Sequence, residues 1–265
     1  YHGWHDWYLA ANINNQNNLD NHLFKGLEAN GVPRELKDTV YTFENNNFNQ
    51  IKRLTEVHDL AAIKLEVTRN ENININFLKK LRNLANKKNI ILIFDECTSG
   101  FRETFGGINK KTGINPDISL FGKSIGNGYP ITALVGKDEV MSSCKETFMS
   151  STFWSDRIGP TAGIATLKEM ERIKSWEIIS KIGNKIKKIW KKLSLNHKLD
   201  ISIQGISSLP NFYFKNRNNL IYKSYITQEM LKKNILATMS IYVCIDHTEK
   251  ILSNYYDNLN NIFYN

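Results

Sequence analysis

Cysteine is scarce in this sequence, and no apolar run in it is long. The 265 residues include three cysteines, Cys97, Cys144 and Cys244. Their odd number and wide spacing indicate neither a disulfide framework nor a paired-cysteine metal site. No apolar run approaches the ~18 residues that a membrane-spanning helix needs. We therefore expect a cytoplasmic protein without a membrane segment.

The start of the sequence lacks a methionine and a signal-peptide pattern. It opens with Tyr1-His2-Gly3, which predicts an N-terminally truncated chain. His2, His5 and Asp6 carry side chains that can bind a metal, but such residues in an irregular start more often lie at a pocket edge or on the surface. No metal site is predicted.

Basic residues outnumber acidic ones, 35 against 26, so the net charge is +9. Much of the excess lies on one expected helix, at residues 177–193, where the lysines fall mainly opposite an apolar stripe. A solvated helix face explains this charge, and the sequence has no aromatic–basic motif of the kind that binds nucleic acid. Neither nucleic acid nor a membrane is a predicted partner.

Strand and helix patterns alternate between residues 61 and 135, which is typical of an α/β sheet. Short apolar runs predict strands at residues 61–67, 90–94, 118–121 and 131–135. Lys64 and Glu66 interrupt the first run, and helical spacing begins at Phe77. We expect residues 1–174 to form a large domain around a mostly parallel sheet.

The pattern from residue 175 to residue 265 differs and predicts a smaller α+β domain. Helices are expected at residues 158–173, 177–193 and 224–233, and strands at residues 212–214 and 235–244. The last helix is predicted to have Asp246 as its N-cap, with Glu249 three residues later. The asparagine-rich stretches 12–21 and 45–49 are expected to be loops.

The segment 121–130, FGKSIGNGYP, is the most informative part of the sequence. It is not a P-loop, because the glycine required five residues before Gly122 is replaced by Asp117. It is not a dinucleotide loop, because Ile131 stands where the third glycine should be. A lysine among glycines after a short strand fits a Schiff-base lysine, which needs room for a flat ring and a low-dielectric pocket. The alternative is that Lys123 is an ordinary solvated lysine.

Asp95 and Glu96 follow a wholly apolar strand, and ligands of α/β sheets bind beyond such strand ends. An unpaired carboxylate there would cost several kcal/mol. A pyridoxal cofactor needs a carboxylate of this kind to keep its ring nitrogen protonated. A helix N-cap or a surface loop would also explain the two acidic residues.

Four segments resemble, in the same order, the motifs of the class III aminotransferases. Residues 93–102, IFDECTSGFR, resemble their strand-and-loop signature, and residues 116–130 resemble their lysine motif. Residues 1–3 are similar to the segment whose tyrosine lies against the cofactor ring. Thr152 and the serine before it resemble the pair whose threonine reaches the cofactor phosphate. The chain looks most like the glutamate-1-semialdehyde 2,1-aminomutase-like members.

This resemblance implies a pyridoxal 5'-phosphate enzyme of fold type I, with a large α/β domain and a smaller C-terminal α+β domain. Lys123 would form the internal aldimine and then move a proton between substrate and cofactor. Asp95 would hold the pyridinium nitrogen. These two residues are the expected catalytic pair.

Further cofactor contacts are implied by the same resemblance. Tyr1, next to His2, would stack on one face of the ring. Cys97 would touch the other face, where the family usually has valine, and a buried cysteine is a similarly small hydrophobic residue. Thr152 would donate to the phosphate across a homodimer interface. Glu66 matches the family's Glu-Pro pair, although proline does not follow it here.

The sequence departs from the family in two places. The phosphate-binding turn of the family lies upstream of the segment matched by residues 1–3 and is not found here, although a helix N-terminus is the usual anion site. After Thr152, the residues Phe153, Trp154 and Arg157 stand where the mutase-like pattern has small residues and a proline. Aromatic rings and a guanidinium favour a larger polar substrate.

These departures favour a transaminase with a small-molecule amino donor and a carbonyl acceptor, and they suggest substrates among sugar-like or surface-polysaccharide precursors. One alternative is an aminomutase, which moves the amino group within a single substrate. Another is an inactive truncated fragment that only dimerises. The sequence leaves all three open.

Overall fold

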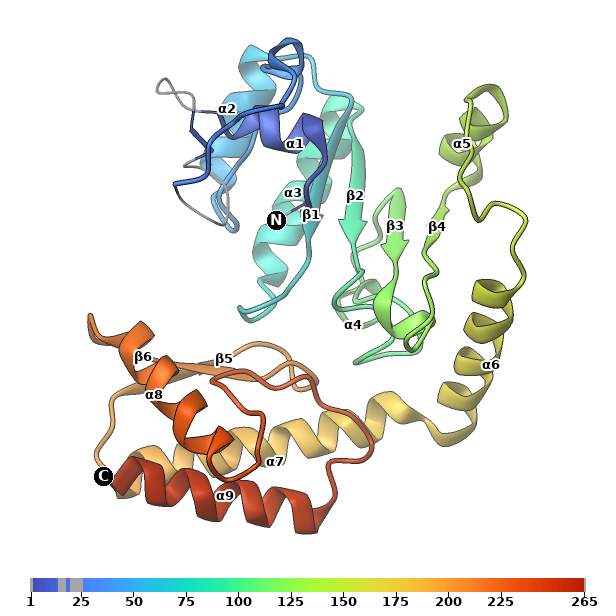
Figure 1. Cartoon of the computed structure of the whole chain (residues 1–265). Coiled ribbons are helices and arrows are strands. Elements are labelled where there is room, and N and C mark those ends of the chain that lie inside the picture. Colours follow the sequence, from blue (N-terminus) through green and yellow to red (C-terminus); the bar gives the residue numbers. More distant parts are fainter. Residues whose placement is uncertain (1, 14–17, 20–25, 265) are drawn as a thin grey trace. The chain divides into compact units, whose positions relative to one another are not determined.

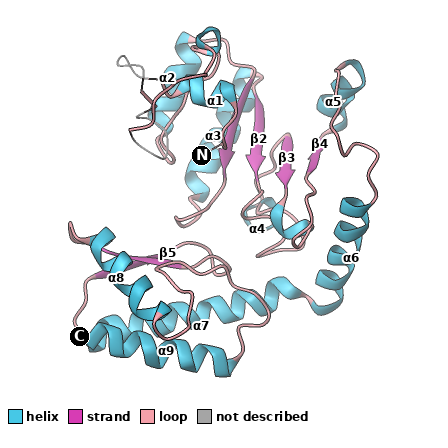
Figure 2. Ribbon diagram, viewed as in Figure 1, coloured by secondary structure: helices cyan, strands magenta, loops and turns pink. Residues whose placement is uncertain are grey.

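The computed structural model describes residues 2–13, 18–19 and 26–264. The chain forms two compact units. The first consists of the residues up to 63 together with residues 76–90, and the second consists of residues 64–75 and those from 91 onward. Figures 1 and 2 show the helices and strands of both units. No helix within the described ranges is both long and apolar enough to cross a bilayer.

The first unit is mainly helical. It contains α1 (Asp6–Ala11), the 3₁₀ turn η1 (Arg34–Leu36), α2 (Phe48–Val57) and nearly all of α3 (Ile75–Lys88). The expectation of a loop at residues 45–49 is wrong, because α2 begins inside that stretch. The side chain of Asn47 accepts a hydrogen bond from the Gln50 N–H (3.2 Å) and caps the helix. Of the other asparagine-rich stretch, residues 14–17 and 20–21 lie outside the described residues.

The main sheet has the strand order β1-β2-β3-β4. Its strands are β1 (Ala62–Glu66), β2 (Ile91–Asp95), β3 (Ile118–Phe121) and β4 (Ala133–Gly136). Strands β2 and β3 are parallel, with Asp95 opposite Leu120, and β4 runs antiparallel to β3. The carboxyl ends of β2 and β3 therefore meet at one edge of the sheet. The four expected strands are confirmed.

Between β2 and β3 the chain folds around the buried Glu96. One carboxylate oxygen accepts the Ser99 hydroxyl (2.5 Å) and the other accepts the Ile108 N–H (2.7 Å). Burial raises the pKa of Glu96. The short helix α4 (Asn109–Thr112) follows. Glu96 thus stabilises the loop that leads from Asp95 to β3.

After β3 come η2 (Lys123–Ile125), α5 (Asp138–Met141), η3 (Ser142–Glu146) and the expected helix α6 (Ile158–Ile173). Lys174, in the left-handed region with φ 51°, joins α6 to α7 (Ser175–Asn196). The antiparallel strands β5 (Ile201–Gln204) and β6 (Asn211–Phe214) and the helices α8 (Asn219–Leu231) and α9 (Glu249–Tyr264) complete the chain.

Side chains from residue 179 to residue 262 form one hydrophobic core, with Trp190, Leu193, Met230 and Leu259 fully buried at its centre. Indole Nε1 of Trp190 donates to the hydroxyl of Tyr255 (2.7 Å) inside this core. A domain boundary between residues 174 and 175 stays a prediction.

Two local expectations for this region are wrong. Residues 235–244 do not form a strand and make only an isolated bridge, Asn211 with Ser240. Pro210 accepts the Ile241 N–H (3.1 Å) but has no N–H to return, so the ladder is interrupted. Asp246 does not cap α9, because the chain enters the helix at Thr248, whose carbonyl accepts the Leu252 N–H (2.9 Å). Strand β5 was not expected from the sequence.

Candidate active site

Lys123 lies two residues beyond the carboxyl end of β3, at the first position of η2. Its φ of 47° is in the left-handed region, which is uncommon for a residue other than glycine. The turn is closed by the Asn127 N–H, which donates to the Lys123 carbonyl (3.2 Å). The chain thus turns directly after β3, which places Lys123 at the carboxyl edge of the sheet.

Close packing requires glycine at position 126 and leaves little room for a side chain at position 122. A Cβ on Gly126 would lie 2.2 Å from the carbonyl oxygen of Tyr129, so only glycine fits that turn. A Cβ on Gly122 would lie 3.3 Å from Cys97 Sγ, so the lysine segment passes directly beside the segment that follows β2. The space expected for a flat ring is therefore confined by Cys97 on this side.

The amine of Lys123 is held by a hydroxyl. Its Nζ donates to Thr98 Oγ1 (2.7 Å), and the Thr98 hydroxyl donates in turn to Glu66 Oε1 (3.1 Å). Thr98 is only 1% exposed. Lys123 itself is exposed in the single chain. A low-dielectric pocket was expected around this lysine, but the contact described for its amine covers only one side of it.

The Thr98 backbone is fixed as well. Arg102 Nε donates to the Thr98 carbonyl (2.8 Å), and the Arg102 guanidinium lies over the ring of Tyr242, 5.4 Å from its centre. Ser124 Oγ donates to the Gly100 carbonyl (2.8 Å). The lysine turn and the segment after β2 are therefore joined at two places, and Thr98 is held where the Lys123 amine reaches it.

Asp95 is the last residue of β2, and two groups hold its carboxylate. Oδ2 lies 3.1 Å from Nζ of Lys64 on β1, and Oδ1 accepts the Cys97 N–H (3.1 Å). Burial alone would raise the pKa of Asp95. Lys64 and the Cys97 N–H together favour the charged form more strongly, so the pKa lies below its ordinary value. Asp95 is therefore an ionised, largely buried carboxylate and neither a helix cap nor a surface residue.

Cys97 interacts electrostatically with both Asp95 and Lys123. Burial, and then the Asp95 carboxylate, raise the pKa of its thiol to about 11, while Lys123 and Lys64 oppose this. The thiol is therefore neutral at physiological pH and presents an uncharged, polarisable surface.

The structure thus brings together three of the residues expected at the site, Asp95, Cys97 and Lys123. It also adds Lys64 and Thr98, to which the sequence assigned no role. The only signal for Lys64 was its interruption of an apolar run, and Thr98 lay unassigned within a recognised motif.

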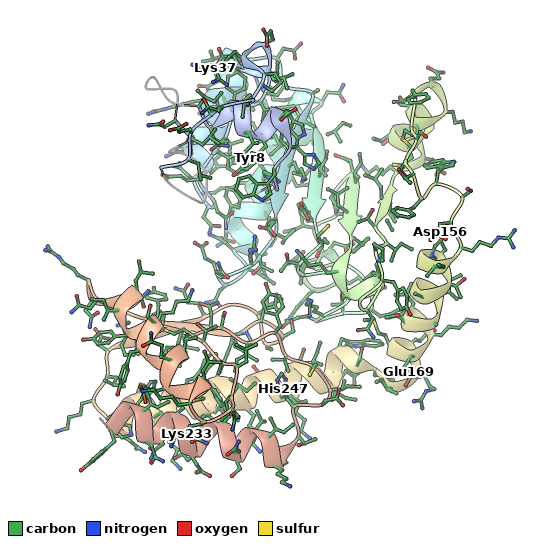
Figure 3. All side chains as sticks on the ribbon, viewed as in Figure 1. Tyr8, Lys37, Asp156, Glu169, Lys233 and His247 are labelled. Atoms are coloured by element: carbon green, nitrogen blue, oxygen red, sulfur yellow. The ribbon has the colours of Figure 1, made fainter. Side chains whose placement is uncertain are left out.

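Three further residues were expected at the site, Tyr1, His2 and Thr152. Tyr1 lies outside the described residues. His2 belongs to the first unit, where its ring packs edge-on against Tyr8, with 5.4 Å between ring centres. Thr152 lies in an exposed turn before α6, close in sequence to Asp156, which Figure 3 labels. Contact of these residues with a cofactor stays a prediction.

Known proteins resemble this chain along most of its length. The model of the family described as aminotransferase class-III matches residues 8–232. The 3-aminobutyryl-CoA aminotransferase of Cloacimonas acidaminovorans is 31% identical over 267 residues, which cover 96% of this chain and 60% of that protein. The glutamate-1-semialdehyde 2,1-aminomutase of Legionella pneumophila (strain Paris) is 34% identical over 199 residues, or 72% of this chain and 46% of that protein. The chain therefore spans about half of the length of these curated relatives.

The fold is also found among solved structures. An omega-transaminase from Sphaerobacter thermophilus superposes with a TM-score of 0.85 at 20% identity, covering 100% of this chain and 66% of that one. A structure titled "Transaminase with PLP bound" gives a TM-score of 0.83, also at 20% identity, and covers 100% of this chain and 65% of that one. The expected α/β architecture of fold type I is confirmed.

Proposed function

The chain belongs to the class-III aminotransferase family, and on that premise we propose that the protein transfers amino groups with pyridoxal phosphate held on Lys123. The observation that carries this proposal is the meeting of a lysine amine, an ionised carboxylate and a neutral thiol at the carboxyl edge of β2 and β3. Bound pyridoxal phosphate would supply an electron sink for the carbanion formed at the substrate.

The residues present fit that cofactor. Lys123 Nζ is an exposed amine that, once deprotonated, could condense with an aldehyde with loss of water. Asp95, with a pKa below its ordinary value, can hold a protonated ring nitrogen. Gly122 has no side chain, so the Cys97 thiol lies close beside the lysine segment, where it can touch a flat ring. Tyr1 would cover the opposite face of that ring.

During turnover, Lys123 Nζ would take a proton from the substrate carbon and return it at a different carbon. Thr98 would orient the amine, and Glu66 would orient the Thr98 hydroxyl by accepting its proton in a hydrogen bond. Asp95 would keep its negative charge throughout.

The partners proposed are a small-molecule amino donor, a carbonyl acceptor and a second copy of the chain. Thr152 would reach the phosphate held by the partner subunit. The same turn exposes Phe153 (70%) and Trp154 (67%) in the single chain, and contact with a second subunit would bury such rings. Together with Arg157, these rings also suit recognition of a larger polar acceptor of the sugar type. A cytoplasmic location is part of this proposal.

The assignment of Lys123 is tested in the complete protein by reduction with borohydride in the presence of pyridoxal phosphate. Reduction should attach the cofactor permanently to the peptide that contains Lys123, as mass spectrometry would detect. Lys123→Ala should lose this label and the activity. Lys145→Ala, which changes an exposed lysine in η3, is the matched control and should keep both. A label that persists in Lys123→Ala would overturn the assignment.

An aminomutase is the second candidate, because one of the relatives reported above carries that name. The two activities differ in their need for an amino donor. The complete protein should not convert glutamate-1-semialdehyde alone into 5-aminolevulinate if it is a transaminase. Efficient conversion without an added donor would establish the aminomutase instead.

A further inference from the structure

Lys64 occupies an interior position of β1 at which an apolar residue would be usual. Ile63, Leu65 and Val67 alternate as buried residues, each no more than 5% exposed, so Lys64 and Glu66 lie on the opposite face. On that face the Lys64 ammonium lies 3.1 Å from Asp95 Oδ2. A strand-interior lysine that contacts the carboxylate of the candidate site is not required by the packing of β1.

We propose that Lys64 is a positioning residue, which holds the Asp95 carboxylate and shares it with the ring nitrogen of the cofactor. The second half of this proposal rests on the proposed function, and the first half concerns only residues of this chain. A carboxylate offers about four lone-pair directions. The Cys97 N–H and Lys64 Nζ occupy one on each oxygen, and the Cys97 thiol is a third hydrogen-bonding partner of Asp95, which leaves room for one more donor.

The consequence is electrostatic. Side chains of Lys64 and Asp95 are only 27% and 12% exposed, so their charges are less screened than those of a surface pair. A fixed ammonium beside Asp95 disfavours a second positive charge on the same carboxylate. The ring nitrogen would therefore hold its proton less tightly than it would beside an aspartate without a lysine partner. In this way Lys64 limits the strength of the electron sink.

The first test needs no cofactor. In the chain labelled with ¹³C at the aspartate carboxyl carbons, NMR would follow the titration of Asp95 in the wild type, Lys64→Met and Lys64→Arg. The Met variant should raise the pKa of Asp95, and the Arg variant should keep it low. Lys137→Met is the matched control, because Lys137, which follows β4, pairs with Asp117, which precedes β3 (2.7 Å), and its loss should leave Asp95 unchanged.

An unchanged Asp95 titration in Lys64→Met would overturn the proposal, whatever the protein does with a cofactor. If Lys64→Met does not fold, Lys64→Gln keeps a hydrogen-bond donor without the charge. The pKa of Asp95 should rise in that variant as well, and an unchanged pKa there would overturn the proposal equally.

The second test compares dissociation constants of pyridoxal phosphate and of its analogue with C–H in place of the ring nitrogen, in the complete protein. The preference for pyridoxal phosphate should be several-fold larger in Lys64→Met than in the wild type. Without Lys64, Asp95 lacks its cation, and only the ring N–H compensates for that loss. If the wild type and Lys64→Met prefer pyridoxal phosphate over the analogue equally, the proposal that Asp95 is shared between Lys64 and the ring nitrogen is wrong. If the wild type binds neither compound, the proposed function fails, while the NMR result still decides whether Lys64 holds Asp95.

Discussion

Two polar side chains of β1 serve two different groups of the candidate site. Lys64 pairs with Asp95, and Glu66 accepts the hydroxyl of Thr98, which holds the Lys123 amine. Because alternate residues of a strand point to the same face, one strand orients both the carboxylate and the lysine. The charge of Glu66 is also balanced by Arg69, 3.4 Å away.

Replacement of Thr98 by valine keeps the shape of the side chain and removes the hydroxyl. The Lys123 amine then loses its partner, and Glu66 Oε1 loses a donor. A hydrogen bond to a charged group contributes about 1.5–3 kcal/mol, so we expect turnover to fall by at least ~10-fold. Steady-state kinetics of the complete protein would measure this. Thr98→Ser keeps the hydroxyl and should stay close to the wild type, and a Val variant as fast as the wild type would show that Thr98 does not orient the amine.

The Cys97 thiol should remain protonated well into alkaline pH. Its pKa of about 11, against an ordinary value of 9.0, means that folding favours the protonated form. The stability that this contributes is complete below pH 9.0 and is lost as the pH rises toward about 11. Thiolate absorbance would follow the titration in a chain that carries Cys144→Ser and Cys244→Ser. Addition of Asp95→Asn should lower the pKa, because the carboxylate raises it, and a wild-type Cys97 that ionises near 9.0 would contradict the burial described here.

At the scale of elements, two long helices each contain a glycine, and close packing requires glycine at only one of these positions. Gly183 of α7 faces Ser207 so closely that a Cβ would lie 1.6 Å from the Ser207 carbonyl oxygen. Gly163 of α6 faces Ile131, and a Cβ there would lie 3.4 Å from its Cδ1, which is an ordinary contact. Only the first glycine is required by the approach of another backbone.

Alanine should therefore destabilise the chain at Gly183 but not at Gly163. Gly183→Ala must displace the backbone at Ser207, and such overpacking costs about 1–3 kcal/mol or more. Gly163→Ala should be neutral or stabilise the chain by up to ~1 kcal/mol, because alanine has the higher helix propensity. Urea unfolding of the two variants and the wild type would measure the difference. Equal free energies of unfolding in the two variants would mean that α7 does not pack on Ser207 in this way.

Across the whole molecule, local sequence patterns predicted the helices and strands that depend on nearby residues. They failed for a strand whose hydrogen bonds depend on a residue distant in the sequence. The expected strand at residues 118–121 and helix at residues 158–173 match β3 and α6, because a short, mostly apolar run and a 3.6-residue period are local properties. The expected strand at residues 235–244 failed because its ladder depends on Pro210, some thirty residues away.

The same distinction applies to the candidate site. That Asp95 and Lys123 lie at one sheet edge follows from two strand ends in a parallel sheet, which the sequence indicates. The contacts of Lys64 and Thr98 depend on how β1 lies beside β2, and single-sequence patterns do not determine this pairing. Asp95 and Lys123 were therefore identified as a pair, while the residues that hold them were not.

The exposed turn before α6 leads to a prediction about assembly. Phe153 and Trp154 are 70% and 67% exposed in the single chain, and large aromatic residues are typical anchors of interfaces. If this turn contacts a second subunit, Trp154→Glu should weaken self-association in the complete protein, as sedimentation equilibrium would measure. The affinity for pyridoxal phosphate should fall in parallel, because Thr152 of the same turn would no longer reach the partner's phosphate site. Leu220→Glu on α8 is the matched control, since Leu220 is 74% exposed and its change should leave both properties intact. A Trp154→Glu protein that associates as tightly as the control would place the interface elsewhere and would leave the two aromatic rings available for the substrate.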